Sequence, residues 1–192
     1  MLELLAPAGN LDAVIAAVQN GADAVYMGFG DGFNARRSAD NFTRESFAKA
    51  VRYCHIRGCK VYVTLNTLVG DREMDAAAAL AQQASDAGAD AILVQDLGLA
   101  RVLRAALPDI PLHASTQMSI HNLAGVEAAA EMGITRAVLA RELSLEQIRF
   151  ISQHASIETE VFVHGALCFC YSGQCYMSAL IGRRSGNRGA CA

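Results

Sequence analysis

The sequence has no tryptophan, only three prolines and no long apolar segment among its 192 residues. So few prolines, together with a hydrophobic content of 53%, exclude a proline-rich disordered or fibrous chain and predict a globular fold with a substantial core. No apolar run approaches the roughly 18 residues that a membrane-spanning helix needs, and the first residues lack the basic region of a signal peptide. We therefore expect a cytoplasmic protein that makes no contact with a membrane.

Excess charge and several catalytic motifs are also missing. The net charge is −3, so no overall basic field predicts nucleic-acid binding, and any contact with RNA must be local. No Gly-x-Gly-x-x-Gly follows the first apolar segment, which disfavours a dinucleotide site. The sequence contains neither the His-Glu-x-x-His of zinc peptidases nor the Gly-x-Ser-x-Gly of serine hydrolases.

The first 163 residues alternate between short apolar segments, rich in β-branched residues as buried strands are, and helical patterns. The predicted strands are 3–5, 24–27, 60–65, 91–94, 111–113, 136–139 and 160–163. The predicted helices are 11–20, 44–57, 72–87, 97–107, 123–132 and 145–154. Residues suited to capping a helix precede four of these: Asn10, Thr43, Asp71 and Ser144, the last with Gln147 in a reciprocal capping box.

A glycine ends three of the helical patterns and precedes an apolar strand by a few residues. Gly21, Gly88 and Gly133 can each adopt the left-handed conformation that terminates a helix. The strands recur at intervals near the roughly 30 residues of a βαβ unit, and they are apolar on both faces, as parallel strands covered by helices must be. We predict an α/β fold of the (β/α)8 TIM-barrel-like type, with seven parallel strands alternating with helices and closure of the barrel left open. A doubly wound open sheet is the alternative.

Polar residues follow the predicted strands. The carboxyl ends of parallel strands share one face, where ligand sites of such folds form, so we expect these residues to converge on one mouth. Each residue alone is also explained as a helix cap or turn. The set comprises Asn10, Asn34, Arg36, Asn66, Gln95, Asp96, Ser115, Thr116, Gln117, Arg141, Glu142 and His164. Arg36, Arg141 and Glu142 stand out, because charged groups beside a barrel mouth are costly unless they are exposed or paired.

Four of the six cysteines lie in the last 25 residues: Cys168, Cys170, Cys175 and Cys191. Thiolates are soft ligands and good nucleophiles, so this cluster predicts a metal or iron–sulfur site, a disulfide or a catalytic thiol. In a reducing compartment a metal or redox site is favoured over structural disulfides. Cys54 and Cys59 are predicted to be structural, one on a helix and one before a strand.

A thiol hydrolase would need a base near its nucleophile. Cys168 or Cys175 could serve as nucleophile, with His164 or His113 as base. Glu142 or Asn66 could orient that base. Both histidines also fit a second interpretation, as hydrogen-bonded residues of the barrel.

The end of the chain is basic and rich in glycine. Arg183, Arg184 and Arg188 lie among glycines, an arrangement suited to bidentate contacts with phosphate or carboxylate groups. RNA or an anionic small molecule could bind there, and Tyr171 and Phe169 could stack on a base. A solvated basic loop is the alternative.

Several long motifs carry a family resemblance. They are Leu5-Ala-Pro-Ala-Gly-Asn, Gly21-Ala-Asp-Ala-Val-Tyr, Tyr62-Val-Thr-Leu-Asn, His113-Ala-Ser-Thr-Gln, Phe162-Val-His-Gly-Ala-Leu-Cys and Tyr171-Ser-Gly-Gln-Cys. In this order they resemble the peptidase U32 family from end to end. The resemblance implies a barrel-like catalytic domain and a protein that continues past Ala192, so that the chain is an N-terminal fragment.

The resemblance also implies a chemistry. Some members of that family are classed as peptidases or collagenases, whereas others act in oxygen-independent hydroxylation of RNA bases or of a quinone precursor and hold a [4Fe–4S] cluster on four cysteines. Carried over by position, Cys168, Cys175 and Cys191 correspond to three ligands, with the fourth beyond Ala192. The position of Cys170 is more commonly a small residue other than cysteine, which makes Cys170 a doubtful ligand. Zinc is the alternative metal.

The working hypothesis is therefore an enzyme with a barrel at residues 1–163 and a Cys-rich segment at residues 164–192 that lies at the barrel mouth. The cluster would handle redox chemistry, Arg36 and Arg141 would anchor an anionic group, and Glu142 or His164 would move protons. Further predicted catalytic residues are His113 and Asn66, and further substrate-binding residues are Asn34, Gln95, Gln117, Arg183, Arg184 and Arg188. A cysteine- or metal-dependent peptidase and a non-catalytic RNA-binding or assembly module are the competing hypotheses.

Overall fold

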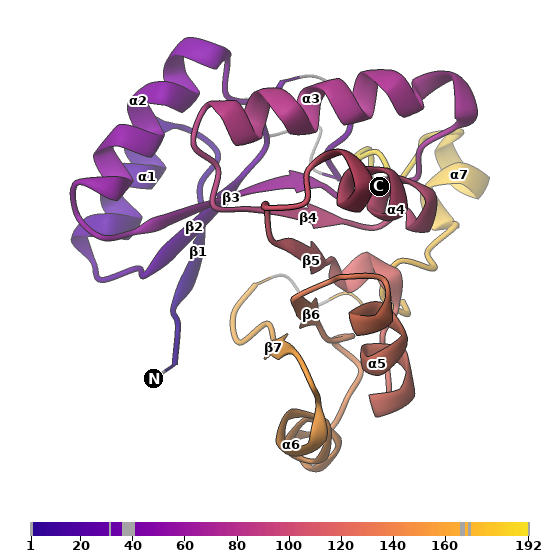
Figure 1. Ribbon diagram of the computed structural model, residues 1–192. Helices are drawn as coiled ribbons and strands as arrows, with labels where there is room; N and C mark the ends of the chain where they lie inside the picture. Colours follow the sequence, from indigo (N-terminus) through magenta and orange to yellow (C-terminus); the bar gives the residue numbers. More distant parts are fainter. Residues whose placement is uncertain (1, 31, 36–40, 166–167, 169, 192) are drawn as a thin grey trace.

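The computed structural model describes residues 2–30, 32–35, 41–165, 168 and 170–191. Within them seven strands form one parallel sheet whose order follows the sequence from β1 to β7. The strands are β1 (Leu5–Pro7), β2 (Ala24–Met27), β3 (Lys60–Leu65), β4 (Ala91–Val94), β5 (Leu112–Ala114), β6 (Arg136–Val138) and β7 (Glu158–Glu160). The sheet curves into a half-barrel with β1 and β7 at its edges (Figure 1).

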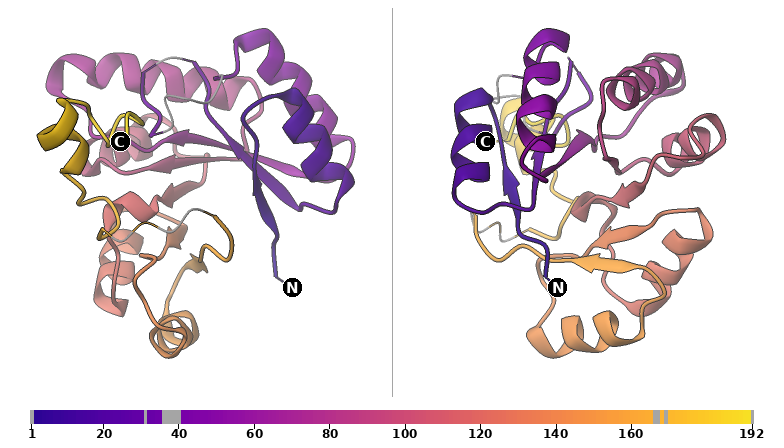
Figure 2. Two further views of the ribbon diagram at one scale, coloured as in Figure 1. Left: turned by 180° about the vertical axis from the view of Figure 1, so that it is seen from behind. Right: turned by 60° about the vertical axis from the view of Figure 1, so that its left-hand side comes forward.

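The helices surround the outer face of this sheet (Figure 2, right). The six helices that do so are α1 (Leu11–Gln19), α2 (Arg44–His55), α3 (Met74–Asp86), α4 (Leu97–Ala106), α5 (Leu123–Glu131) and α6 (Leu145–His154). The short helix α7 (Met177–Gly182) lies in the tail of the chain, beside the end of the sheet (Figure 1), and two 3₁₀ turns, η1 (Asp71–Glu73) and η2 (Thr116–Met118), follow β3 and β5. Two large apolar clusters join the outer sheet face to the helices, whereas a smaller cluster around Tyr62 and Leu93 lines the inner face. Helices on one face only confirm the barrel-like prediction and exclude the doubly wound alternative.

Local signals in the sequence explain most of the helix boundaries. The side chains of Asn10 and Thr43 accept the N–H groups of Ala13 and Ser46, so each caps its helix as predicted. Ser144 and Gln147 form the reciprocal capping box of α6. The glycines at the ends of α1, α3 and α5 have φ values of +90°, +96° and +81°, which confirms the predicted left-handed terminations.

Several predicted boundaries are wrong. The strand predicted at 160–163 lies at Glu158–Glu160. Its pairing with β6 ends at Glu160, whose carbonyl accepts the Leu139 N–H, and Val163 beyond it is 86% exposed. Asp71 does not cap a helix; it begins η1, and the Glu73 carboxylate accepts the Gly70 N–H at 3.0 Å before α3 starts. β1 also begins two residues later than predicted.

A buried ion cluster lies on the inner face at the amino ends of the strands. Arg136, the first residue of β6, donates to Glu3 and to Glu158, and its Nη1 lies 3.6 Å from a Glu160 oxygen. Tyr62 donates to Glu3 at 2.9 Å. Burial opposes ionisation of Glu3, but the hydrogen bonds from Arg136, Tyr62 and Lys60 together outweigh it and lower the Glu3 pKa from 4.5 to about 2. We call these five residues the basal ion cluster.

Among the described residues, no helix combines the length and the apolar composition that crossing a bilayer requires.

Candidate active site at the carboxyl ends of the strands

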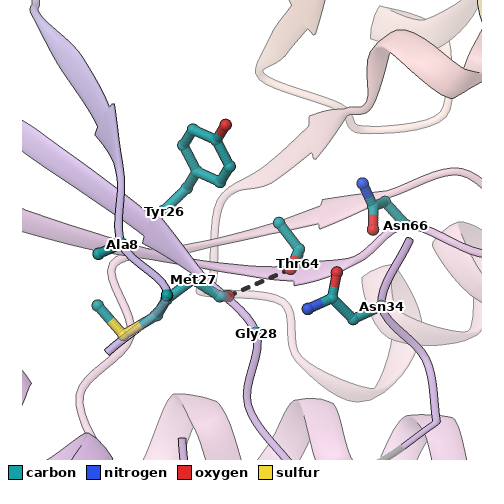
Figure 3. Close-up of a pocket in the computed structure, with 8 residues that line it drawn as sticks. Ala8, Tyr26, Met27, Gly28, Asn34, Thr64 and Asn66 are labelled. Carbon is teal, nitrogen blue, oxygen red and sulfur yellow. Dashed lines mark hydrogen bonds between the residues drawn. The ribbon is translucent and has the colours of Figure 1, made fainter. Parts of the chain in front are cut away.

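Two solvent-open hollows of about 350 and 320 Å³ adjoin each other on the inner face, toward the carboxyl ends of the strands, and Figure 3 shows the first of them. Both are lined by Tyr26, Thr64 and Asn66, so they form one continuous space, which we call the mouth hollow. The remaining lining residues are Ala8, Gly9, Met27, Gly28 and Asn34 on one side and Leu93, Ser115, Thr116, Val138, Glu160 and Phe162 on the other.

Hydrogen bonds orient the amide side chains on the β2–β3 side of the mouth hollow. Asn66 accepts the Ala35 N–H at 3.1 Å and donates to the Ser115 hydroxyl at 3.4 Å. Asn34 donates to the Asn41 side-chain oxygen at 3.0 Å. These amides stand close to Thr64 (Figure 3), and such fixed donors and acceptors suit a planar polar ligand.

Gly28 allows this arrangement. A Cβ at that position would lie 2.0 Å from the Asn34 amide nitrogen and 2.2 Å from the Asn41 side-chain oxygen. The predicted site residues Asn34 and Asn66 therefore both line the hollow.

Gln95 and Gln117 hold the tail of the chain rather than facing open solvent. The Asn187 amide donates to Gln95 Oε1 at 2.6 Å and to Gln117 Oε1 at 3.4 Å, while its oxygen accepts the Leu68 N–H at 2.9 Å. Asn187 was not among the predicted site residues. In the sequence, only its position between Gly186 and Arg188, in the basic segment, could have drawn attention to it.

Arg141 and Glu142, which follow β6, meet the Cys-rich segment at Ser172. The Ser172 hydroxyl accepts from the backbone N–H and the Nε–H of Arg141, both at 3.2 Å, and donates to Glu142 at 3.0 Å. Burial raises the Glu142 pKa, but the hydrogen bonds from Ser172 outweigh it and the net shift is downward. An ionised, hydrogen-bonded carboxylate is suited to positioning rather than to donating a proton.

His121 is a second residue that sequence analysis missed. It donates from Nδ1 to the Ser119 carbonyl at 2.6 Å, and its Nε2 lies 3.8 Å from a Glu142 oxygen. Its ring lies 6.0 Å from that of Tyr171. The residue sits in a loop between a 3₁₀ turn and a helix, where no periodicity draws attention to it.

The thiols of Cys168, Cys170 and Cys175 approach one another. A hydrogen bond with Cys175, then desolvation and the charges of Cys175 and Cys168, raise the pKa of Cys170. Cys170, the doubtful ligand, is thus central to this group, which we call the thiol loop (Cys168–Cys175). Cys191 is exposed, and no contact links it to these three thiols in the part of the chain that the structure describes.

Within the described ranges, no group of three or more His, Cys, Asp or Glu side chains is arranged to hold a metal ion. The donor chemistry of the thiol loop nevertheless fits a soft metal or an iron–sulfur cluster. Neighbouring thiolates repel each other, and bound iron or zinc would neutralise that charge.

Other predicted residues lie elsewhere. His113 is in the middle of β5, 4% exposed, with its ring edge-on to Tyr62 at 4.9 Å, so it adjoins the basal ion cluster rather than the mouth. His164, Arg183 and Arg184 are exposed. Arg36 lies outside the described residues.

Arg188 is half-buried and tied to the loops after β2 and β3. Its guanidinium donates to Glu73 at 2.7 Å and to the carbonyls of Leu68 and Gly32 at 2.9 and 3.1 Å. Cys54 and Cys59 are buried in the core between the sheet and α2, in agreement with their predicted structural role.

A parallel half-barrel with a polar hollow at the carboxyl ends of its strands defines the class of (β/α)-barrel proteins, whose ligand sites lie at that end. The family model of peptidase family U32 matches residues 9–192, and the chain belongs to this family.

Three curated relatives illustrate the range of names within the family. The chain is 45% identical over 190 residues to the 23S rRNA 5-hydroxycytidine C2501 synthase of Escherichia coli (strain K12), covering 99% of this chain and 28% of the relative. It is 41% identical to the tRNA hydroxylation protein P1 of Bacillus subtilis (strain 168), covering 98% and 44%. It is 36% identical to a protein of Porphyromonas gingivalis (strain ATCC BAA-308 / W83) named collagenase, covering 99% and 48%. The chain therefore spans less than half the length of each.

Solved structures support the fold. A U32 peptidase of known structure superposes with a TM-score of 0.72 at 18% identity, covering 88% of this chain and 71% of that one. A putative glycerophosphodiester phosphodiesterase from Galdieria sulphuraria gives a TM-score of 0.61 at 10% identity, covering 84% of both chains. At these identities the likeness concerns the barrel alone.

Proposed function

We propose that the protein hydroxylates a base in RNA and acts in the cytoplasm. The observation that carries this proposal is the end-to-end similarity to proteins named for rRNA and tRNA hydroxylation, at 45% and 41% identity. The geometry is compatible with it. The mouth hollow offers fixed amide and hydroxyl groups of the kind that bind a planar base, and the thiol loop is attached beside it at the end of β6.

We propose that Cys168, Cys175 and Cys191 hold a [4Fe–4S] cluster together with a further ligand, with Cys170 as an alternative ligand within the thiol loop. When bound, such a cluster supplies one-electron redox chemistry. The protein's own residues bind and orient the base: Asn34 and Asn66 through their amides, and Thr64 and Tyr26 as walls of the hollow. The exposed Arg183 and Arg184 are placed to contact phosphates.

The test is nucleoside mass analysis of rRNA and tRNA from a strain that lacks the gene. We expect one hydroxylated nucleoside to disappear, to return with the full-length wild-type gene and with a Cys54→Ser variant, and not to return with Cys175→Ser. An RNA modification profile that is unchanged by the deletion would refute the proposal.

A peptidase is the second candidate, favoured by the collagenase-named relative. In that case the thiol of Cys168 or Cys175 would act as the nucleophile. Peptide cleavage that survives replacement of Cys168, Cys175 and Cys191 together would exclude this thiol mechanism.

A further inference from the structure

Ser172 is fully buried, whereas its described neighbours in the thiol loop are exposed or half-buried. All of its polar groups are paired. Its N–H donates to Glu142, its carbonyl accepts from the Ser119 hydroxyl, and its own hydroxyl bonds to Arg141 and Glu142. A buried serine with every donor and acceptor satisfied holds one conformation.

The arrangement assigns the hydroxyl proton of Ser172. Both Arg141 groups that reach the oxygen are N–H donors, so they occupy its two lone pairs. Because the other Glu142 oxygen accepts the Ser172 N–H, both oxygens act as acceptors, as those of a carboxylate do, and the single hydroxyl proton must point to Glu142. The amide nitrogen of a glutamine at position 142 could not accept it.

Gly173, the next residue, packs closely against the loop after β5. Its φ is +77°, and a Cβ there would lie 2.1 Å from the Gln117 carbonyl oxygen. Gln174 then donates to the Ser119 hydroxyl at 3.0 Å, and Ser119 itself has a left-handed φ of +59°. Backbone conformations of this kind persist only where the surroundings fix them.

We propose that Ser172 is the positioning residue of the thiol loop: clamped by Arg141 and Glu142, it sets where Cys170 and Cys175 stand relative to the mouth hollow. Ser172 lies between these two cysteines in sequence, so fixing its backbone constrains the loop on both sides. The consequence for catalysis rests on the proposed RNA hydroxylation, whereas the clamp itself does not.

The test uses phenylarsine oxide, which captures two thiols only when they are held close together. In the wild-type protein, free of iron, we expect capture by Cys170 and Cys175. In Ser172→Ala the capture affinity should fall at least about tenfold, which corresponds to 1.4 kcal/mol. Alkylation of the same thiols by iodoacetamide, which needs one thiol at a time, should not slow.

Ser156 provides a matched control. It forms the same pair of bonds with a glutamate, through its N–H at 2.9 Å and its hydroxyl at 2.5 Å to Glu127, in the turn before β7, at the opposite end of the strands from the mouth. Ser156→Ala should therefore leave arsenical capture unchanged.

Glu142→Gln tests the same clamp without touching the loop, and it covers the case in which Ser172→Ala does not fold. We expect it to weaken capture as Ser172→Ala does, and the double variant to lose less than the sum of the two single losses, because both variants affect the bond between the Ser172 hydroxyl and Glu142. Unchanged capture in Glu142→Gln, or additive losses in the double variant, would overturn the proposal.

The two proposals fail separately, because arsenical capture involves neither RNA nor iron. Suppose that Glu142→Gln weakens arsenical capture, but that deleting the gene leaves the RNA modification profile unchanged. The positioning role of Ser172 would then be supported, and the proposed RNA hydroxylation would be refuted.

Discussion

Arg136 is the residue whose removal should cost the most stability. Its side chain is 10% exposed, and it lies between the carboxylates of Glu3, Glu158 and Glu160. Arg136→Ala would leave the partly buried Glu160 without its positive partner and Glu3 with the exposed Lys60 alone, so we expect a loss of about 3 to 5 kcal/mol in urea unfolding. The exposed Arg101 on α4 is the control, since Arg101→Ala should change the free energy of unfolding by less than about 0.5 kcal/mol. A loss below about 1 kcal/mol for Arg136→Ala would contradict this account.

His113 makes stability depend on pH. Burial, and then the charge of Arg136, lower its pKa from 6.5 to about 3. In the unfolded chain the imidazole binds a proton below pH 6.5, but the folded protein does not until about pH 3, so its contribution is lost as pH falls through that window.

Comparison with His113→Gln isolates this contribution. Between pH 7 and pH 5 the wild type should lose about 2 kcal/mol more than the variant, since each unit below the unfolded pKa costs about 1.4 kcal/mol. Urea unfolding at both pH values measures the difference. Parallel losses in the two proteins would show that His113 is not held neutral.

His113 also shows where sequence reasoning fails at this scale. A predicted strand at 111–113 places the histidine at the strand end, and hence at the mouth; the true β5 runs one residue further and leaves it in the middle. Asn66, Gln95 and Glu142 do follow the carboxyl ends of β3, β4 and β6, as predicted, because residues directly after parallel strands share one face. How far His113 lies from the end of its three-residue strand depends on the register of β5, and that register is determined by pairing with β4 and β6.

The glycines that end the helices permit a prediction at the scale of elements. Gly21 and Gly133 both have left-handed φ values, +90° and +81°. An added Cβ would meet nothing within 4 Å at Gly21 but would lie 2.7 Å from the Arg104 side chain at Gly133. Arg104 has little freedom to move, because it donates to the carbonyls of Leu107 and Pro108.

Gly21→Ala should therefore cost about 1 kcal/mol for backbone strain alone, whereas Gly133→Ala should cost more. Thermal unfolding of the two variants in parallel measures the gap. Equal losses of stability in the two variants would mean that the Arg104 side chain moves away from the new Cβ without destabilising the protein.

Sequence analysis misplaced β7 and did not predict α7, because neither element carries a local signal in the sequence. β7 consists of Glu-Thr-Glu, which no hydrophobic pattern marks as a strand; it forms because Glu158 and Glu160 face Arg136 of the adjacent strand. α7 has no side-chain cap, and Leu180 is 83% exposed, so neither capping nor burial announces it. The helices with caps and a buried face were predictable because those signals are local.

At the scale of the whole molecule, the basic tail returns across the carboxyl end of the half-barrel, opposite the N-terminal residues (Figure 2, left). Asn187 and Arg188 attach it to the loops after β2, β3, β4 and β5. In the sequence the three arginines of this tail look equivalent. The fold separates them, since Arg188 has a carboxylate and two carbonyls as partners while Arg183 and Arg184 are exposed.

That separation predicts different effects for the three arginines. Arg188→Ala removes the ion pair with Glu73, so hydrogen exchange should accelerate at the turn amides of Arg188, Gly189 and Ala190, which bond within the tail. The double variant Arg183→Ala/Arg184→Ala should leave this protection unchanged, because neither side chain holds the tail in place. With single-stranded RNA it should instead lower the slope of log affinity against log salt concentration by about 1.4, the value for two lost phosphate contacts. Unchanged salt dependence in the double variant would mean that RNA, if bound, is held elsewhere, and that the exposed arginines serve only to keep the tail solvated.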